Sequence, residues 1–151
     1  MVPRHTGRGL VIKDGKILLM ERWRGEDHYF SIPGGGIEVG ETAEQAAVRE
    51  IMEETGVTAK VVKPVCIAKY GERQHYFFLC EYITGEPHLP PESEEASRPA
   101  ENNRYLPRWV SIEEAATLPF GYWEPIREWL LYSLNRGFSD QVMVVSVIQS
   151  R

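Results

Sequence analysis

The chain is predicted to be a single α/β domain in which helices pack on a mixed β-sheet. At 151 residues it has the size of one ordinary domain, and 42% of it is apolar, which is enough for a sizeable core. Its 13 glycines and 10 prolines favour many turns and short elements over a helical bundle. Strand-like and helical segments intermix without a regular βαβ repeat, which favours a mixed sheet.

Three strands are predicted in the first 33 residues. Residues 9–22 (GLVIKDGKILLMER) contain two apolar strands joined at Asp14 and Gly15, a typical hairpin turn. Residues 28–33 (HYFSIP) form a short strand that ends where Pro33 and three glycines interrupt it.

The next segment, Thr42 to Thr55, is the strongest helix prediction in the chain. Thr42 followed by Gln45 has the spacing of a capping box, and Gly56 stands where a C-cap glycine belongs. Projected at about 100° per residue, Glu50, Glu53 and Glu54 fall within one arc of about 100°. The small residues that continue this stripe toward the helix N-terminus are Ala43, Ala46 and Ala47. A separate apolar stripe, expected to face the core, consists of Val48, Ile51 and Met52.

The rest of the chain is predicted to add strands first and helices later. Two strands at 58–70 and 74–84 are followed by a polar, proline-rich loop at 85–103, a strand at 104–110, and helices at 111–118 and 122–137. Loops of that length are often functional. Residues 138–151 are predicted to contain a strand. We expect this strand to pair within the fold or across a dimer, because an uncovered apolar strand favours aggregation. We therefore expect a domain at 1–137 and an extension at 138–151.

Composition excludes several classes of function. The net charge of −5 argues against a protein that binds polymeric nucleic acid. No apolar run approaches the roughly 20 residues of a membrane span, and the N-terminal sequence is no signal peptide. Cys66 and Cys80 lie in apolar runs without CxxC spacing, so we expect buried thiols, no zinc site and a reducing cytoplasm.

The three helix glutamates have two interpretations. Glutamate-rich helices are commonly solvated surfaces. However, like charges one turn apart are destabilising unless they are neutralised, and carboxylates beside small side chains leave room for a hydrated cation such as Mg²⁺. Upstream, glycines 34–36 allow the backbone close to a metal or phosphate. Glu41 adds a fourth carboxylate, and Arg49 can hold carboxylates through bidentate hydrogen bonds. Together these residues favour a metal site.

Residues 35–57, GGIEVGETAEQAAVREIMEETGV, resemble the Nudix box. That signature is Gly, five residues, Glu, seven residues, Arg-Glu, an aliphatic residue, any residue, Glu-Glu, any residue, Gly and an aliphatic residue. Every position is filled, by Gly35, Glu41, Arg49, Glu50, Ile51, Glu53, Glu54, Gly56 and Val57. The flanks DGKILLMER and RYLPRWVSIEEAATL also resemble a Nudix domain, so the resemblance covers the chain outside about its last dozen residues.

The resemblance implies an α/β/α sandwich around a mixed sheet and an enzyme that hydrolyses a nucleoside diphosphate linked to another moiety. It implies Mg²⁺ or Mn²⁺ bound by Glu50, Glu53 and Glu54, with help from the Gly35 backbone. Arg49 would orient the glutamates, and Glu41 would support the site. Metal ions suit this chemistry because they neutralise phosphate oxygens and activate water, so no nucleophilic side chain is needed.

The general base is left open between the box and the long loop. Glu50 is the candidate within the box. The loop at 85–103 offers Glu92, Glu94, Glu95 and Glu101, of which Glu101 is preferred because it lies just before the strand at 104–110. Arg22 and Arg24 flank Trp23 near the end of a strand, and they are candidates for substrate binding or for a solvated edge.

The substrate is predicted to be a small nucleotide. A nucleoside triphosphate is slightly favoured, because the proline typical of ADP-ribose-cleaving relatives is not found near residue 72 and the coenzyme A motif is missing. ADP-ribose or a nucleotide sugar is the alternative. Two non-catalytic readings also stay open, a nucleotide-sensing domain and an acidic interaction helix without metal, although the intact box argues against the first. A homodimer through the C-terminal strand is an open alternative to a monomer.

Overall fold

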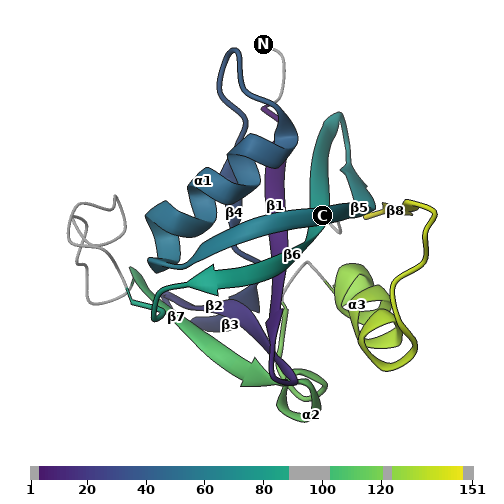
Figure 1. The fold of residues 1–151 in the computed structure, drawn as a ribbon. Helices are drawn as coiled ribbons and strands as arrows, with labels where there is room; N and C mark the ends of the chain where they lie inside the picture. Colours follow the sequence, from purple (N-terminus) through teal and green to yellow (C-terminus); the bar gives the residue numbers. More distant parts are fainter. Residues whose placement is uncertain (1–3, 89–102, 121–123, 148–151) are drawn as a thin grey trace.

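The computed structural model describes residues 4–88, 103–120 and 124–147. Two helical layers enclose a mixed sheet, which confirms the predicted fold class (Figure 1). The helices are α1 (Ala43–Thr55), α2 (Ile112–Ala115) and α3 (Glu124–Arg136). The strands are β1 (Thr6–Lys13), β2 (Lys16–Arg24), β3 (Asp27–Ser31), β4 (Gly34–Gly36), β5 (Thr58–Tyr70), β6 (Arg73–Thr84), β7 (Asn103–Ser111) and β8 (Met143–Ser146).

The described strands form one eight-stranded sheet with two branches, one at β1 and one at β2. Its main order is β3-β2-β1-β6-β5-β8, while β4 pairs with β1 and β7 pairs with β2. The β1–β6 and β5–β8 pairs are parallel, and the other pairs are antiparallel. The β1–β2 hairpin turns at Asp14 and Gly15, whose φ angles of 51° and 73° are those of a tight turn that matches strand twist.

The C-terminal strand β8 lies within the same molecule, at the edge of the sheet beside β5. Cys66 to Lys69 of β5 pair in parallel with Met143 to Ser146. The backbone N–H of Val147 also donates to the carbonyl oxygen of Lys69 at 2.8 Å. How residues 138–151 divide from the main domain stays a prediction.

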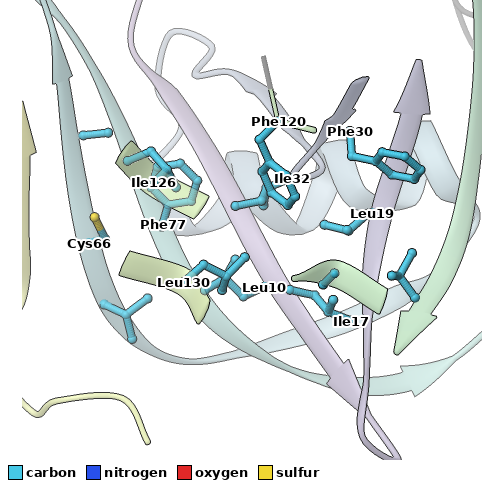
Figure 2. Close-up of a cluster of buried hydrophobic side chains, with 14 of the residues drawn as sticks. Leu10, Ile17, Leu19, Phe30, Ile32, Cys66, Phe77, Phe120, Ile126 and Leu130 are labelled. Atoms are coloured by element: carbon cyan, nitrogen blue, oxygen red, sulfur yellow. The ribbon is translucent and has the colours of Figure 1, made fainter. Parts of the chain in front are cut away.

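The larger core cluster lies between the sheet and α3. Figure 2 shows that Ile126 and Leu130 of α3 approach Leu10 of β1 and Phe77 of β6, with Phe30 and Phe120 completing the cluster farther along. Burial of these aromatic and aliphatic side chains is the main source of stability in this layer. No helix in the described ranges has the length and apolar content needed to cross a membrane.

The second core cluster lies between the sheet and α1, and glycine makes this contact close. A Cβ atom on Gly7 of β1 would lie 2.2 Å from the carbonyl oxygen of Ala43. A Cβ on Gly9 would lie 2.4 Å from Cδ1 of Ile51. Strand β1 therefore meets α1 backbone to backbone, and the helix must present small residues to it.

This close contact corrects the predicted faces of α1. Ala46 and Ala47 are fully buried with Ile51, so the small residues form the buried face that was expected to be lined by Val48 and Met52. Met52 is 42% exposed and therefore does not anchor the helix. Val48 is half-buried and lines a groove of about 550 Å³ between α1 and β5. The helical projection gives relative angles only, and the glycines of β1 decide which arc turns inward.

Candidate functional site

The site is built where the short strand β4 leads into α1. Strand β4 pairs with the beginning of β1, with Gly35 opposite Gly7. Helix α1 then begins at Thr42, whose hydroxyl accepts from the Gln45 N–H while the Gln45 side chain accepts from the Thr42 N–H. Gly56 ends the helix with a φ of 79°. The predicted capping box and C-cap are confirmed, and they fix the length and start of the helix that carries the glutamates.

Arg49 lies at the centre of a cluster of carboxylates. Its Nε and Nη2 atoms donate to the two carboxylate oxygens of Glu41 at 2.7 and 3.0 Å. Its Nη1 atom donates to Glu50 at 2.9 Å and to Glu53 at 3.1 Å, and Nη2 also donates to the Gly36 carbonyl at 2.9 Å. One guanidinium group thus joins the glycine strand, the loop before the helix and two helix glutamates. Only arginine has the planar set of donors that this geometry needs.

Arg49 controls the charge of Glu41. Hydrogen bonds from Arg49, and next from the backbone N–H of Glu38, lower the pKa of Glu41 to about 2. The same ion pair raises the pKa of Arg49. Glu41 therefore stays ionised at all ordinary pH values, and the Arg49–Glu41 pair is a fixed support rather than a proton donor.

Glu50 is held in a different environment, against the backbone of Gly35. A Cβ atom on Gly35 would lie 2.4 Å from the carboxyl carbon of Glu50, so a side chain there would displace this carboxyl group. Burial raises the pKa of Glu50, and the charge of Glu53 acts in the same direction, while the hydrogen bond from Arg49 and a hydrogen bond shared with Glu54 oppose them. A partly buried carboxyl that has two acidic neighbours is a group that a cation would stabilise.

The donor atoms at this position suit a hard divalent cation. The carboxylates of Glu50 and Glu54 are neighbours, and the Gly35 backbone lies directly against the first of them. The Glu53 side chain is 55% exposed, against 18% for Glu50, and is therefore the more accessible of the two to an ion. All of these donors are oxygen atoms, as Mg²⁺ and Mn²⁺ require. Among the described residues no three acidic, histidine or cysteine side chains are already gathered as a metal site.

The two arginines expected to bind substrate lie on β2. Leu18 of β2 packs in the α1 cluster, and side chains alternate along a strand, so Arg22 and Arg24 face the same side of the sheet as α1. Arg22 lies 4.2 Å above the ring of Tyr105 and 5.4 Å from that of Tyr29, and it also donates to the Tyr105 hydroxyl. Arg24 is exposed.

Two residues that contact the site or its glycine strand, Tyr105 and Arg4, were not among the candidates predicted from the sequence. Glu101 and the other loop candidates, Glu92, Glu94 and Glu95, lie outside the described residues. Tyr105 was missed by sequence reasoning, and only its register opposite Arg22 identifies it as a partner. Arg4 was also missed, although it donates to the carbonyl oxygens of Gly36 and Ile37 at 3.4 Å each. No local motif marks Arg4, because the contact depends on the pairing of β1 with β4.

A glycine strand that leads into a helix bearing carboxylates, on a sheet enclosed by two helical layers, defines an α/β/α protein with a candidate cation site. The NUDIX domain family matches residues 3–132, and the chain belongs to this Nudix family.

Similar proteins fall in the same family. An ADP-ribose pyrophosphatase of Methanocaldococcus jannaschii is 33% identical, over 77% of this chain and 72% of that protein. An RNA pyrophosphohydrolase of Shigella boydii is 31% identical, over 94% of this chain and 83% of that protein. Among solved structures, an ADP-ribose pyrophosphatase of Streptococcus suis has a TM-score of 0.65 at 21% identity, over 95% of this chain and 98% of that chain. This last similarity supports the fold alone.

Proposed function

We propose that this protein hydrolyses a pyrophosphate bond of a nucleoside triphosphate with the help of Mg²⁺ or Mn²⁺ held at the glutamates of α1. The observation that carries the proposal is the Arg49 cluster, in which one guanidinium group fixes Glu41, Glu50 and Glu53 around the glycine strand. Membership of the Nudix family supports the reaction class, a hydrolase acting on phosphoric anhydrides.

In this proposal each residue has a separate task. Glu50, Glu53, Glu54 and the Gly35 backbone hold the metal, which neutralises phosphate oxygens and makes a water molecule more acidic. Arg49 keeps the carboxylates oriented, and Glu41 keeps Arg49 in place. Glu50 is our candidate for the base that takes the proton from the attacking water, because its carboxyl is partly buried and its pKa is raised. Glu101 remains the alternative.

Substrate binding is proposed for the α1-facing side of β2. Arg22 presents a permanent positive charge there, and the rings of Tyr29 and Tyr105 restrict its motion. A fixed guanidinium suits a phosphate or a nucleobase edge. Arg24 is exposed on the same side of the strand and would extend this positive region.

A second candidate substrate is ADP-ribose. A relative named ADP-ribose pyrophosphatase is 33% identical to this chain, which supports that candidate despite the missing proline near residue 72. Either substrate is a small molecule containing a nucleoside diphosphate. The buried, reduced thiols of Cys66 and Cys80 are consistent with a cytoplasmic enzyme.

A substrate panel tests the proposal directly. Purified protein with Mg²⁺ or Mn²⁺ would be given nucleoside triphosphates, oxidised dGTP, ADP-ribose, dinucleoside polyphosphates, nucleotide sugars and a short RNA with a 5′-terminal triphosphate. We expect nucleoside monophosphate and pyrophosphate from a triphosphate, and no reaction after addition of EDTA. Preference for ADP-ribose or RNA would replace the proposed substrate while keeping the reaction.

The same panel separates the enzyme from a nucleotide sensor. A sensor would bind one of these nucleotides, as a shift in melting temperature would reveal, without cleaving any of them. An acidic interaction helix would show neither cleavage nor a shift with Mn²⁺. Absence of cleavage across the whole panel in both metals would overturn the proposed function.

A further inference from the structure

A chain of hydrogen bonds joins β1, β6 and the segment between β3 and β4 on the face of the sheet opposite the candidate metal site. Arg8 of β1 donates through Nη1 to the carbonyl oxygen of Ile32 at 2.9 Å and through Nε to the hydroxyl of Thr6 at 3.2 Å. The Thr6 hydroxyl lies 2.6 Å from Nδ1 of His75 on β6. We call these three residues, Arg8, Thr6 and His75, the β1 relay.

Only the Arg8 end of the β1 relay has a fixed direction. Arginine can only donate, so the oxygen of Thr6 is the acceptor for Arg8. Burial, and next the charges of Arg8, Arg73 and His5, lower the pKa of His75 to about 3, so the ring is neutral. The Thr6 hydroxyl donates to Nδ1 of His75 when the ring proton is on Nε2, and it accepts from Nδ1 in the other tautomer.

Two residues of the β1 relay lie next to the glycine strand β4. Thr6 pairs with Gly36 and Arg8 pairs with Gly34, so both relay residues on β1 lie directly opposite the glycine strand. Between them, Gly7 pairs with Gly35 and faces α1. Alternate residues of β1 therefore hold β4 from one face while α1 and Glu50 contact it from the other.

The stem of Arg8 also restricts β4. A Cβ atom on Gly34 would lie 2.4 Å from Cγ of Arg8, so the side chain lies directly against the glycine backbone. Strand β4 has only three residues and no side chains with which to fix itself. Its position must then come from neighbours, and the carbonyl of Ile32 just before it is one of the groups that Arg8 holds.

We propose that the β1 relay is a positioning device for the glycine strand that the metal site uses. Thr6 and His75 fix the rotamer of Arg8, and Arg8 fixes the backbone from Ile32 to Gly34. Gly35 is thereby kept against the carboxyl of Glu50. None of the three residues touches the metal or the substrate in this inference, which rests on the proposed metal-dependent function.

Thr6 offers the cleanest test, because the residue is only 6% exposed and its side chain has close isosteres. Thr6→Val keeps the shape and removes the hydroxyl, whereas Thr6→Ser keeps the hydroxyl and removes a methyl group. We expect Thr6→Val to weaken Mn²⁺ binding about tenfold, the lower range for the loss of an outer hydrogen-bond partner. kcat should fall by a similar factor with a smaller change in KM, while Thr6→Ser stays within about threefold of wild type.

Mn²⁺ affinity is measured by electron paramagnetic resonance, well below the melting temperature and without substrate. His75→Gln, whose amide oxygen can still accept from Thr6, is expected to retain most of the affinity, and His75→Leu to lose it. These two variants decide the question if Thr6→Val does not fold.

Three outcomes would overturn the positioning role. The first is wild-type Mn²⁺ affinity in Thr6→Val, and the second is an equal loss in Thr6→Ser, which would assign the effect to packing. The third is a lower melting temperature with unchanged affinity and kcat. Failure of the proposed function is recognisably different, because the wild-type protein itself would then neither bind Mn²⁺ nor cleave any nucleotide.

Discussion

At the scale of single residues, Arg49 explains why several like charges are tolerated together. The carboxylates of Glu41, Glu50 and Glu53 lie close together and would repel one another. The guanidinium group of Arg49 donates to all three and offsets this repulsion. The pair with Glu41 is bidentate and keeps that carboxylate ionised. Neighbouring Glu50 is instead pushed toward protonation by burial. The pKa values of these two carboxyl groups are thus shifted in opposite directions. The lowered pKa of Glu41 suits a fixed support, and the raised pKa of Glu50 suits a candidate base.

Replacing Arg49 with lysine tests whether the hydrogen-bond geometry of the guanidinium group is needed in addition to its charge. Lysine keeps the charge but cannot donate in the plane to Glu41 while also reaching Glu50, Glu53 and Gly36. We expect Arg49→Lys to lower the hydrolysis rate by about tenfold or more, measured as kcat on the best substrate of the panel. The control is Arg136→Lys, at an exposed arginine that lies over Tyr132. Equal rates for Arg49→Lys and wild type would show that charge alone is sufficient.

The sequence predicts the helix that carries the candidate site better than it predicts the surroundings of that helix. The spacing of Glu50, Glu53 and Glu54 on a capped helix is a local property, so it could be recognised without a structure. The contacts of Arg22 with Tyr105 and of Arg8 with Ile32 are not local, because they depend on which strands become neighbours. Pairing of that kind leaves no signal in a short stretch of sequence.

At the scale of elements, the contact between α1 and β1 sets the height of the helix above the sheet. Two glycines on β1 bring the strand against Ala43 and Ile51, and Glu50 is thereby carried to Gly35. Helix boundaries and caps were predictable from local residues. The buried face of α1 was not, because the expected core residue Met52 lies on the exposed side. A helix takes the orientation that its neighbour allows, and here β1 presents two glycines at the closest contact.

Gly7→Ala should therefore damage both stability and activity. The added methyl group would meet the backbone of Ala43 at 2.2 Å, so α1 must move away from β1. We expect a loss of about 1–3 kcal/mol in the free energy of unfolding, as for an overpacked core, measured by urea denaturation. We also expect weaker Mn²⁺ binding, because Glu50 moves with the helix.

A matched glycine control separates the two effects. Gly71→Ala adds the same methyl group in a turn where nothing lies within 4 Å, although its φ of 62° costs about 1–2 kcal/mol. Activity should be normal in Gly71→Ala and reduced in Gly7→Ala at the same temperature. Normal stability and normal Mn²⁺ binding in Gly7→Ala would contradict the close contact.

At the scale of the whole molecule, the two faces of the sheet have different tasks. The face toward α3 carries the larger core, and cross-strand stacking, such as Trp23 on His28, stabilises it where β2 meets β3. On the side toward α1, the helix itself carries the glutamates and strand β2 carries Arg22. An acidic helix and a basic strand on one face suit a substrate whose phosphates need a cation and whose remainder needs a positive or aromatic contact.

We propose above all that the glutamates of α1 hold the metal that drives pyrophosphate hydrolysis. The most direct test of this proposal is the hydrolysis rate of Glu53→Gln with saturating Mg²⁺, compared with wild type and with Glu44→Gln, at an exposed glutamate near the start of the same helix. We predict a loss of about 100-fold or more in Glu53→Gln and a normal rate in Glu44→Gln, because amide substitution removes an anionic metal ligand in the first case only. A normal rate in Glu53→Gln would contradict the claim.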